Sequence, residues 1–171
     1  MKYLRRFVWY IATRLLMICA LVSVMVVVFY YAMNTTNIYI VLKDGMAKRA
    51  QVIMTMEKDP SELTKFFQTS YLAADQAVQM TISGDSPYEN FNMVGMDHRL
   101  TMEWMWSWPW DDTARAVITE TVPKIDARPK ASAAGNENAP SWQGVKYRVV
   151  LAKENGQWKI RSLTAMEYVD N

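Results

Sequence analysis

The sequence predicts an α+β protein in which a single N-terminal transmembrane helix is followed by helices packed on a curved antiparallel sheet. Three observations predict this class: an uncharged run at residues 15–33, apolar residues at helical spacing over residues 38–78, and alternation of apolar with polar residues after residue 98. Steps of three and four residues are typical of an amphipathic helix, and strict alternation is typical of a half-buried strand. Helices followed by antiparallel strands favour one sheet with the helices on its apolar face.

The run at residues 15–33, LLMICALVSVMVVVFYYAM, contains no charged residue, proline or glycine. A helix rises about 1.5 Å per residue and the hydrocarbon core of a bilayer is about 30 Å thick, so a run of this length crosses once. We expect an uncleaved anchor, because a cleaved signal peptide needs a small residue where Tyr30-Tyr31-Ala32 has a bulky one. A buried core helix is the other alternative, but the uncharged run is too long for one.

The flanks of this run predict its orientation. Residues 1–14 form a tail with four basic residues and no acidic one, whereas residues 34–42 carry no charge. Because positively charged flanks stay on the cytoplasmic side, we place the tail in the cytoplasm. Residues 38–171 then form an extracytoplasmic domain of a single-pass protein of the cell membrane, and the anchor has membrane lipid as its partner.

Composition limits what the outer domain can do. The whole chain has 19 basic and 17 acidic residues, and four of the basic ones lie in the tail, so the remainder carries a net charge of −2. This balance gives no support to nucleic-acid binding, which needs a basic patch or stripe. Cys19 is the sole cysteine and lies within the apolar run, so a hydrophobic core must hold the outer domain without disulfides.

Two helical stretches follow the anchor. Residues 38–57 predict an amphipathic helix, in which Gly45 costs about 1 kcal/mol relative to alanine and is interpreted as a kink. Asp59 before Pro60 predicts a helix start, with Glu62 as the acidic arm of a capping box. This second helix, or helix pair, is expected to run from 60 to about 78 and to end before a turn at Ser83-Gly84. Its apolar side holds Leu63, Phe66, Phe67, Tyr71 and Leu72.

After this turn the spacing changes to that of strands. Residues 99–108 alternate most regularly, with Leu100, Met102 and the tryptophans on one face. We expect Trp104, Trp106 and Trp108 to line the core together with Trp158, and Trp110 to be the exposed member of the series. Residues 113–122 predict the next strand. Residues 127–141, ARPKASAAGNENAPS, predict a flexible surface loop, and residues 145–163 predict a closing hairpin with its turn at Asn155-Gly156.

The order of these elements resembles the cone-shaped nuclear transport factor two-like fold of the cystatin-like superfamily. The resemblance covers about residues 41–168 and rests on the helix with Leu63 and Phe67, the tryptophan-rich strand and the closing pair VKYRVVLAKENGQWKIRSL. A cystatin-like helix on a sheet is the nearest alternative. One anchor with such a domain outside also resembles the inner-membrane scaffold proteins of type IV secretion and the related conjugation proteins of Gram-positive bacteria. That resemblance implies assembly with partner proteins and no catalysis, although fold alone does not assign function.

Residues 93–98 hold the candidate metal ligands and the candidate general base of the outer domain. Met93, Met96 and His98 could together hold Cu(I), which prefers soft ligands, and His98 beside Asp97 could act as a general base. The chain has 13 methionines, however, and methionine is an ordinary core filler. No second histidine and no activated serine or cysteine pattern accompanies His98. We therefore expect no enzymatic activity, no metal and no cofactor.

Two functions remain open on the sequence. The leading hypothesis is a non-enzymatic scaffold that binds a protein partner or a second copy in a bacterial envelope complex. It predicts a filled core and an apolar patch on the outer sheet face or at Trp110. The alternative is a sensing domain with a hydrophobic pocket between helices and sheet. The residues that could form the pocket or the partner surface are His98, Arg99, Glu103, Trp104, Trp106 and Trp110.

Overall fold

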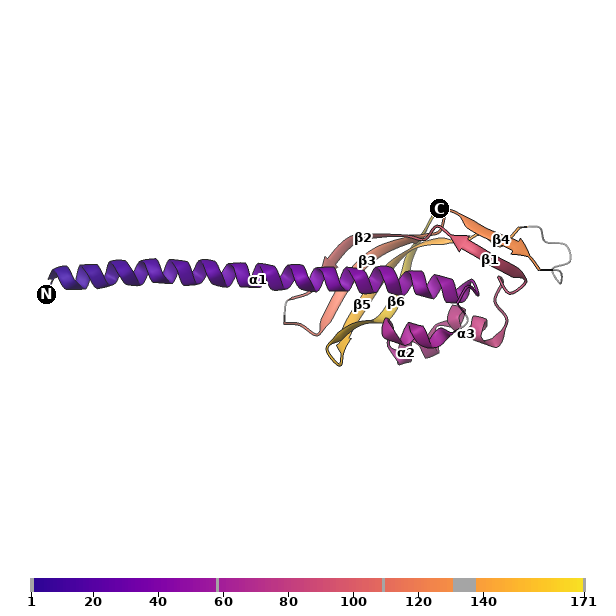
Figure 1. The fold of residues 1–171 in the computed structure, drawn as a ribbon, viewed down its shortest axis with the longest axis horizontal. Helices are drawn as coiled ribbons and strands as arrows, with labels where there is room; N and C mark the ends of the chain where they lie inside the picture. The colour runs from indigo at the N-terminus through magenta and orange to yellow at the C-terminus, as the bar shows by residue number, and fades with distance from the viewer. Residues whose placement is uncertain (1, 58, 109, 131–137, 171) are drawn as a thin grey trace.

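The computed structural model describes residues 2–57, 59–108, 110–130 and 138–170. They form an α+β protein with a long N-terminal helix, short helices after it and antiparallel sheets at the C-terminal end (Figure 1). The helices are α1 (Lys2–Ile53), the 3-10 helix η1 (Pro60–Lys65), α2 (Thr69–Ala74) and α3 (Gln76–Ser83). The strands are β1 (Phe91–Met96), β2 (Arg99–Trp106), β3 (Thr113–Thr121), β4 (Ile125–Pro129), β5 (Gly144–Glu154) and β6 (Gln157–Val169).

The strands form two sheets rather than the one predicted from the sequence, because β1 and β4 pair with each other and not with the other four strands. The larger has the order β2-β3-β5-β6, and the smaller pairs β1 with β4; every pairing in both sheets is antiparallel. The segment between η1 and α2 is tied to the larger sheet by backbone hydrogen bonds, since Ile160 N donates to Phe66 O at 2.7 Å and Gln68 N donates to Ile160 O at 2.9 Å. The short helices are therefore held at the β6 side of the sheet.

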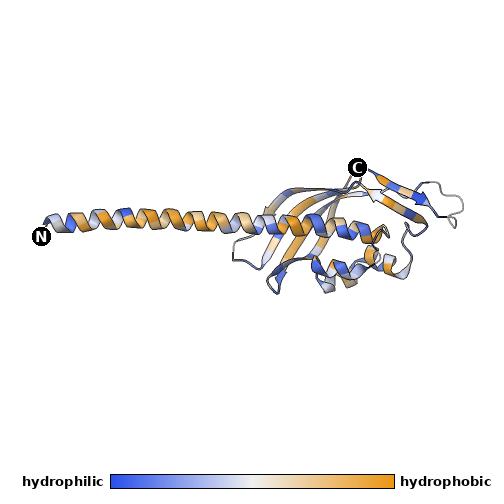
Figure 2. Ribbon diagram, viewed as in Figure 1, coloured by the Kyte–Doolittle hydropathy of each residue, from blue (hydrophilic) through white to orange (hydrophobic). Residues whose placement is uncertain are grey.

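The N-terminal half of α1 is exposed and apolar. Its most apolar stretch is 0% buried, so the run at residues 15–33 is not a core helix. Among the described residues, α1 is the one helix that is long and apolar enough to cross a membrane. Figure 2 shows hydrophilic bands near the N-terminus of α1, then a mostly hydrophobic stretch, and again hydrophilic residues where the helix lies along the sheet.

The C-terminal half of α1 packs on the sheet. Ile38, Leu42 and Met46, spaced by four residues, are completely buried, as the predicted amphipathic pattern required. They join a core that includes Ile118, Val149, Leu151 and Ile160 from three strands. The apolar run and the core helix are thus one continuous element, and it ends at Ile53 rather than at residue 57.

Gly45 does not kink this helix. α1 runs through it unbroken, and a Cβ atom at this position would lie 2.9 Å from Phe66 Cβ and 3.3 Å from Ile160 Cδ1. The interpretation as a kink was wrong, because glycine serves here to admit a close approach of the segment after η1.

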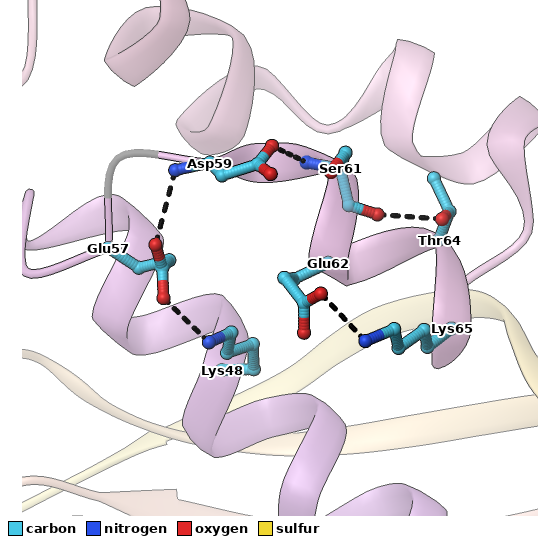
Figure 3. Close-up of polar contacts among 7 residues, drawn as sticks. All are labelled: Lys48, Glu57, Asp59, Ser61, Glu62, Thr64 and Lys65. Atoms are coloured by element: carbon cyan, nitrogen blue, oxygen red, sulfur yellow. Dashed lines mark hydrogen bonds and ion pairs between the residues drawn. The ribbon is translucent and has the colours of Figure 1, made fainter.

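The start of η1 confirms half of the predicted capping. Asp59 accepts a hydrogen bond from Ser61 N at 2.9 Å, with Pro60 as the first helical residue (Figure 3). The capping-box role of Glu62 was wrong, since Glu62 pairs with Lys65 Nζ at 2.6 Å. Glu57 takes that role, because its Oε1 accepts the Asp59 N–H at 3.3 Å.

The remaining boundaries differ modestly from the expectations. The stretch from 60 to 78 is three short helices, and α3 continues to Ser83, where Gly84 ends it with φ +83°. The hairpin turn at Asn155-Gly156 is confirmed, with φ values of 52° and 80°. Residues 127–129 of the expected flexible loop belong to β4, and residues 131–137 lie outside the described part of the chain.

Candidate functional site

Glu103 forms a β-bulge that decides where the tryptophans of β2 point. Met102 is paired with Ile118, but Trp104 is paired with Val117, so Glu103 is an extra residue. Beyond the bulge Met105, not a tryptophan, lies opposite buried Ala116 and packs against the core. Trp104 and Trp106 lie on the outer face of the sheet.

The expectation that these tryptophans fill the core was therefore wrong. Trp104 and Trp106 are 51% and 48% exposed, and Trp108 is half exposed as well. A shift of one residue in the alternation moves every following side chain to the other face, and a bulge produces that shift. Trp158, on a strand where the alternation holds at this point, is 5% exposed and lies in the core as predicted.

The two charged residues predicted near the pocket make surface pairs instead. Glu103 accepts a hydrogen bond from Thr119 Oγ1 at 2.7 Å and pairs with Lys146 Nζ, and these contacts lower the pKa of Glu103. Arg99 pairs with Asp97 at 2.6 Å on the exposed side of β2. Glu103 thus holds the bulge on the outer face, and neither residue faces the core.

Aromatic contacts continue from β2 into the loop that follows it. The Trp106 and Trp108 rings meet edge to face with centroids 5.6 Å apart, and Trp108 stacks on Trp110 at 5.5 Å. We call Trp104, Trp106, Trp108 and Trp110 the tryptophan strip. Trp110 is 68% exposed, which confirms the expectation that it is the exposed member at the end of the series.

The far end of the strip lies beside the apolar helix. Trp110 lines a shallow hollow of about 320 Å³ together with Val26, Val27 and Tyr30 of α1. One helical step further along, Asn34 Nδ2 donates to Trp108 O at 3.4 Å. The end of β2 and the start of β3 lie at the edge of the larger sheet that is nearer the N-terminus of α1, as Figure 1 shows.

A buried ion pair that the sequence reasoning missed lies on the inner side of the domain. Arg49 of α1 donates to both carboxylate oxygens of Asp75, at 2.6 and 3.0 Å, and the two side chains are 10% and 5% exposed. Burial opposes both charges, but the mutual hydrogen bonds and opposite charges outweigh it. They raise the pKa of Arg49 and lower that of Asp75. Arg49 follows Met46 by three residues and so falls on the apolar face of the helix. A charged residue on that face was the sequence feature that could have predicted a buried ion pair.

His98 belongs to a second buried polar contact. Its Nε2 lies 2.9 Å from Glu120 Oε1, and both side chains are almost fully buried. Glu120 occupies the inward position of the alternation between Ile118 and Val122, which the sequence reasoning passed over. A histidine beside a carboxylate has the composition of a general acid–base pair. Here the contact is buried and joins the residue before β2 to β3.

The predicted small-molecule pocket does not form as expected. A cavity between helices and sheet cannot be bordered by Trp104 and Trp106, because both are on the outer face. A larger hollow, of about 600 Å³, lies instead around the C-terminal end of α1, near α3 and β1, and its lining includes Met56, Ile82 and Phe91.

The methionines near His98 are partly buried and pack against the edge of the core. Met93 and Met96 both pack against the core, although strict alternation would place them on opposite faces, because β1 has a bulge between Met93 and Gly95. Within the described residues no three His, Cys, Asp or Glu side chains gather in a way that could hold a metal ion.

No family model, no curated protein and no solved structure matches this chain.

Proposed function

We propose that this chain is a non-enzymatic, single-pass protein of the cell membrane, whose extracytoplasmic domain assembles with a protein partner or with a second copy. The observation that carries the proposal is the exposure of Trp104 and Trp106 on the outer face of β2. Tryptophan is enriched among the residues that dominate binding energy, and exposed apolar patches mark interaction sites.

The surroundings of these two side chains have the composition of an interface. Across the sheet Trp104 lies opposite Val117, and Trp106 lies opposite Arg115, which in turn is paired with Val150. An apolar centre bordered by arginine is typical of protein–protein contacts. β2 is also the terminal strand in the order of the larger sheet, so the patch lies at an edge that a neighbour can approach.

The anchor proposal draws on the continuity of α1. The apolar run and the core residues Ile38, Leu42 and Met46 share one helix, so an uncleaved anchor passes directly into the core of the domain. The basic tail places the N-terminus in the cytoplasm by the positive-inside rule. An envelope scaffold with a cone-like outer domain, similar to secretion and conjugation proteins, is the setting this arrangement favours.

Affinity purification of the full-length protein in mild detergent tests the assembly. We expect wild-type protein to recover a partner or to form oligomers, and a Trp104→Ala/Trp106→Ala variant to lose that association at least several-fold. Val94→Ala is the matched control, because Val94 is an exposed apolar residue on β1 in the smaller sheet. Wild-type protein that emerges alone and monomeric at all concentrations would overturn the proposal.

Labelling of intact cells tests the topology. A tag after Asn171 should react with an impermeant reagent, and a tag before Met1 should react only after the membrane is opened. The reverse pattern would contradict the proposed orientation.

A further inference from the structure

We infer that Trp110, shortly after β2, dips into the outer leaflet of the bilayer and is a second membrane contact beside α1. The partner proposed for the Trp110 side chain is thus the lipid of the bilayer. This inference rests on the proposed membrane crossing of α1, but it is independent of the proposed protein assembly.

The depth of Trp110 follows from its neighbours on the helix. Trp110 shares its hollow with Val26, Val27 and Tyr30, which all belong to the apolar run at residues 15–33. Tyr30 and Val26 precede the end of this run by about 5 and 10 Å along the axis, at 1.5 Å per residue. Because α1 is continuous, a bilayer that surrounds the run also surrounds a side chain at that level.

The chemistry of the loop fits this position. Trp110 is the most exposed of the strip, and its ring stacks on Trp108, which is also open on one side. Tryptophan rings settle at the boundary between headgroups and acyl chains, where the apolar body is buried and the indole N–H stays near polar groups. Exposure that would be unfavourable in water becomes favourable there.

Polar contacts mark the level at which the apolar zone ends. Asn34, the first residue after the run, receives a hydrogen bond from Trp158 Nε1 at 3.4 Å and lies close to Trp108 O. On the returning side of the loop, Asp112 Oδ1 lies 3.8 Å from Lys153 Nζ, and Asp112 O accepts the Lys153 N–H at 2.9 Å. The acidic end of the loop is thus tied to β5, while Trp110 faces the helix.

Two membrane contacts would constrain the domain more than one. A domain on α1 alone could tilt freely against the bilayer, but an immersed Trp110 favours the tilt at which its side of α1 lies deepest. Trp104 and Trp106 remain exposed on the outer face of the sheet, where a partner can reach them.

Site-specific spin labelling of the full-length protein tests the depth. The protein carries Cys19→Ser and one new cysteine, at Trp110, Val28 or Val94, and is reconstituted in vesicles of phosphatidylcholine and phosphatidylglycerol. We expect the Trp110→Cys label to collide several-fold more with oxygen than with a water-soluble nickel complex, as the Val28→Cys label in the apolar run should. The Val94→Cys label, on β1, should show the opposite preference.

A second measurement keeps the wild-type loop intact. Lipids brominated in the upper acyl chain should quench the tryptophan fluorescence of wild-type protein more than that of a Trp110→Phe variant. A label at 110 as open to nickel as the label at 94, with no difference in bromine quenching, would overturn the inference while the anchor stands. A nickel-accessible label at 28 would overturn the membrane crossing itself, and with it this inference.

Discussion

The buried pair of Arg49 and Asp75 allows a quantitative test of how burial changes the value of an ion pair. The chain contains a matched exposed pair, Lys65 with Glu62, at the same distance of 2.6 Å. In the buried pair the side chains are 10% and 5% exposed, whereas Lys65 and Glu62 are 63% and 39% exposed. Distance alone predicts equal effects, so a difference reports the burial of the Arg49 pair together with its second hydrogen bond.

We expect Asp75→Asn to destabilise the protein by about 3 kcal/mol, the lower end of the range for breaking a buried pair. Asparagine keeps the shape and can still accept the Ala77 N–H, which Asp75 Oδ1 accepts at 3.2 Å. The loss of stability therefore comes from the uncompensated charge of Arg49. The charge of Glu120 also raises the pKa of Arg49, and this second favourable interaction limits the loss. Glu62→Gln should cost less than about 1 kcal/mol, because water screens the exposed pair.

The assay is urea unfolding of the full-length protein in mild detergent, followed by far-ultraviolet circular dichroism. A double variant, Arg49→Met with Asp75→Asn, should recover much of the loss, since it removes the charge that Asp75→Asn leaves buried. A cost of Asp75→Asn no larger than that of Glu62→Gln, or a double variant no more stable than Asp75→Asn alone, would refute the reasoning.

Three further predictions use the same unfolding assay. Gly45→Ala should lower the urea midpoint, because the new Cβ would be packed too closely against Phe66, at a cost of about 1–3 kcal/mol. This cost exceeds the gain of about 1 kcal/mol in helix propensity, and a higher midpoint would contradict the reasoning. The pKa of Asp75 is lower in the folded than in the unfolded protein, where it is about 3.9, so its charge stabilises the fold above that value and the stabilisation is lost as pH falls through the folded pKa. Below about pH 4 the difference in free energy of unfolding between wild type and Asp75→Asn should therefore narrow; a constant difference would argue against the reasoning. Trp158→Ala should cost about 3–5 kcal/mol and Trp104→Ala less than about 1, as burial dictates; equal costs would return Trp104 to the core.

Much of the fold was predictable from local patterns. The apolar run, the helical spacing of Ile53 and Leu42, the Asp59-Pro60 start and the Asn155-Gly156 turn each act within a few residues of the chain. Such signals depend on backbone preference and side-chain period, so they can be interpreted without knowledge of the partner segments. They yielded the order of the elements and most of the core.

The sequence could name candidate residues for the site but not their geometry. It singled out the tryptophans, yet the face on which Trp104 and Trp106 lie depends on the extra residue Glu103. A bulge exists only relative to the opposite strand, here at Ile118 and Val117. The spacing of residues within β2 therefore could not predict it.

What the sequence by itself determined is a membrane-length apolar helix followed by a disulfide-free α+β domain, because hydrophobicity and periodicity are properties of neighbouring residues. Tertiary structure alone decided that Gly45 admits Phe66, that Arg49 meets Asp75, and that Trp110 lies beside Val26. Each of these depends on segments far apart in the chain meeting in space, where steric fit and the cost of a buried charge are set by the partner.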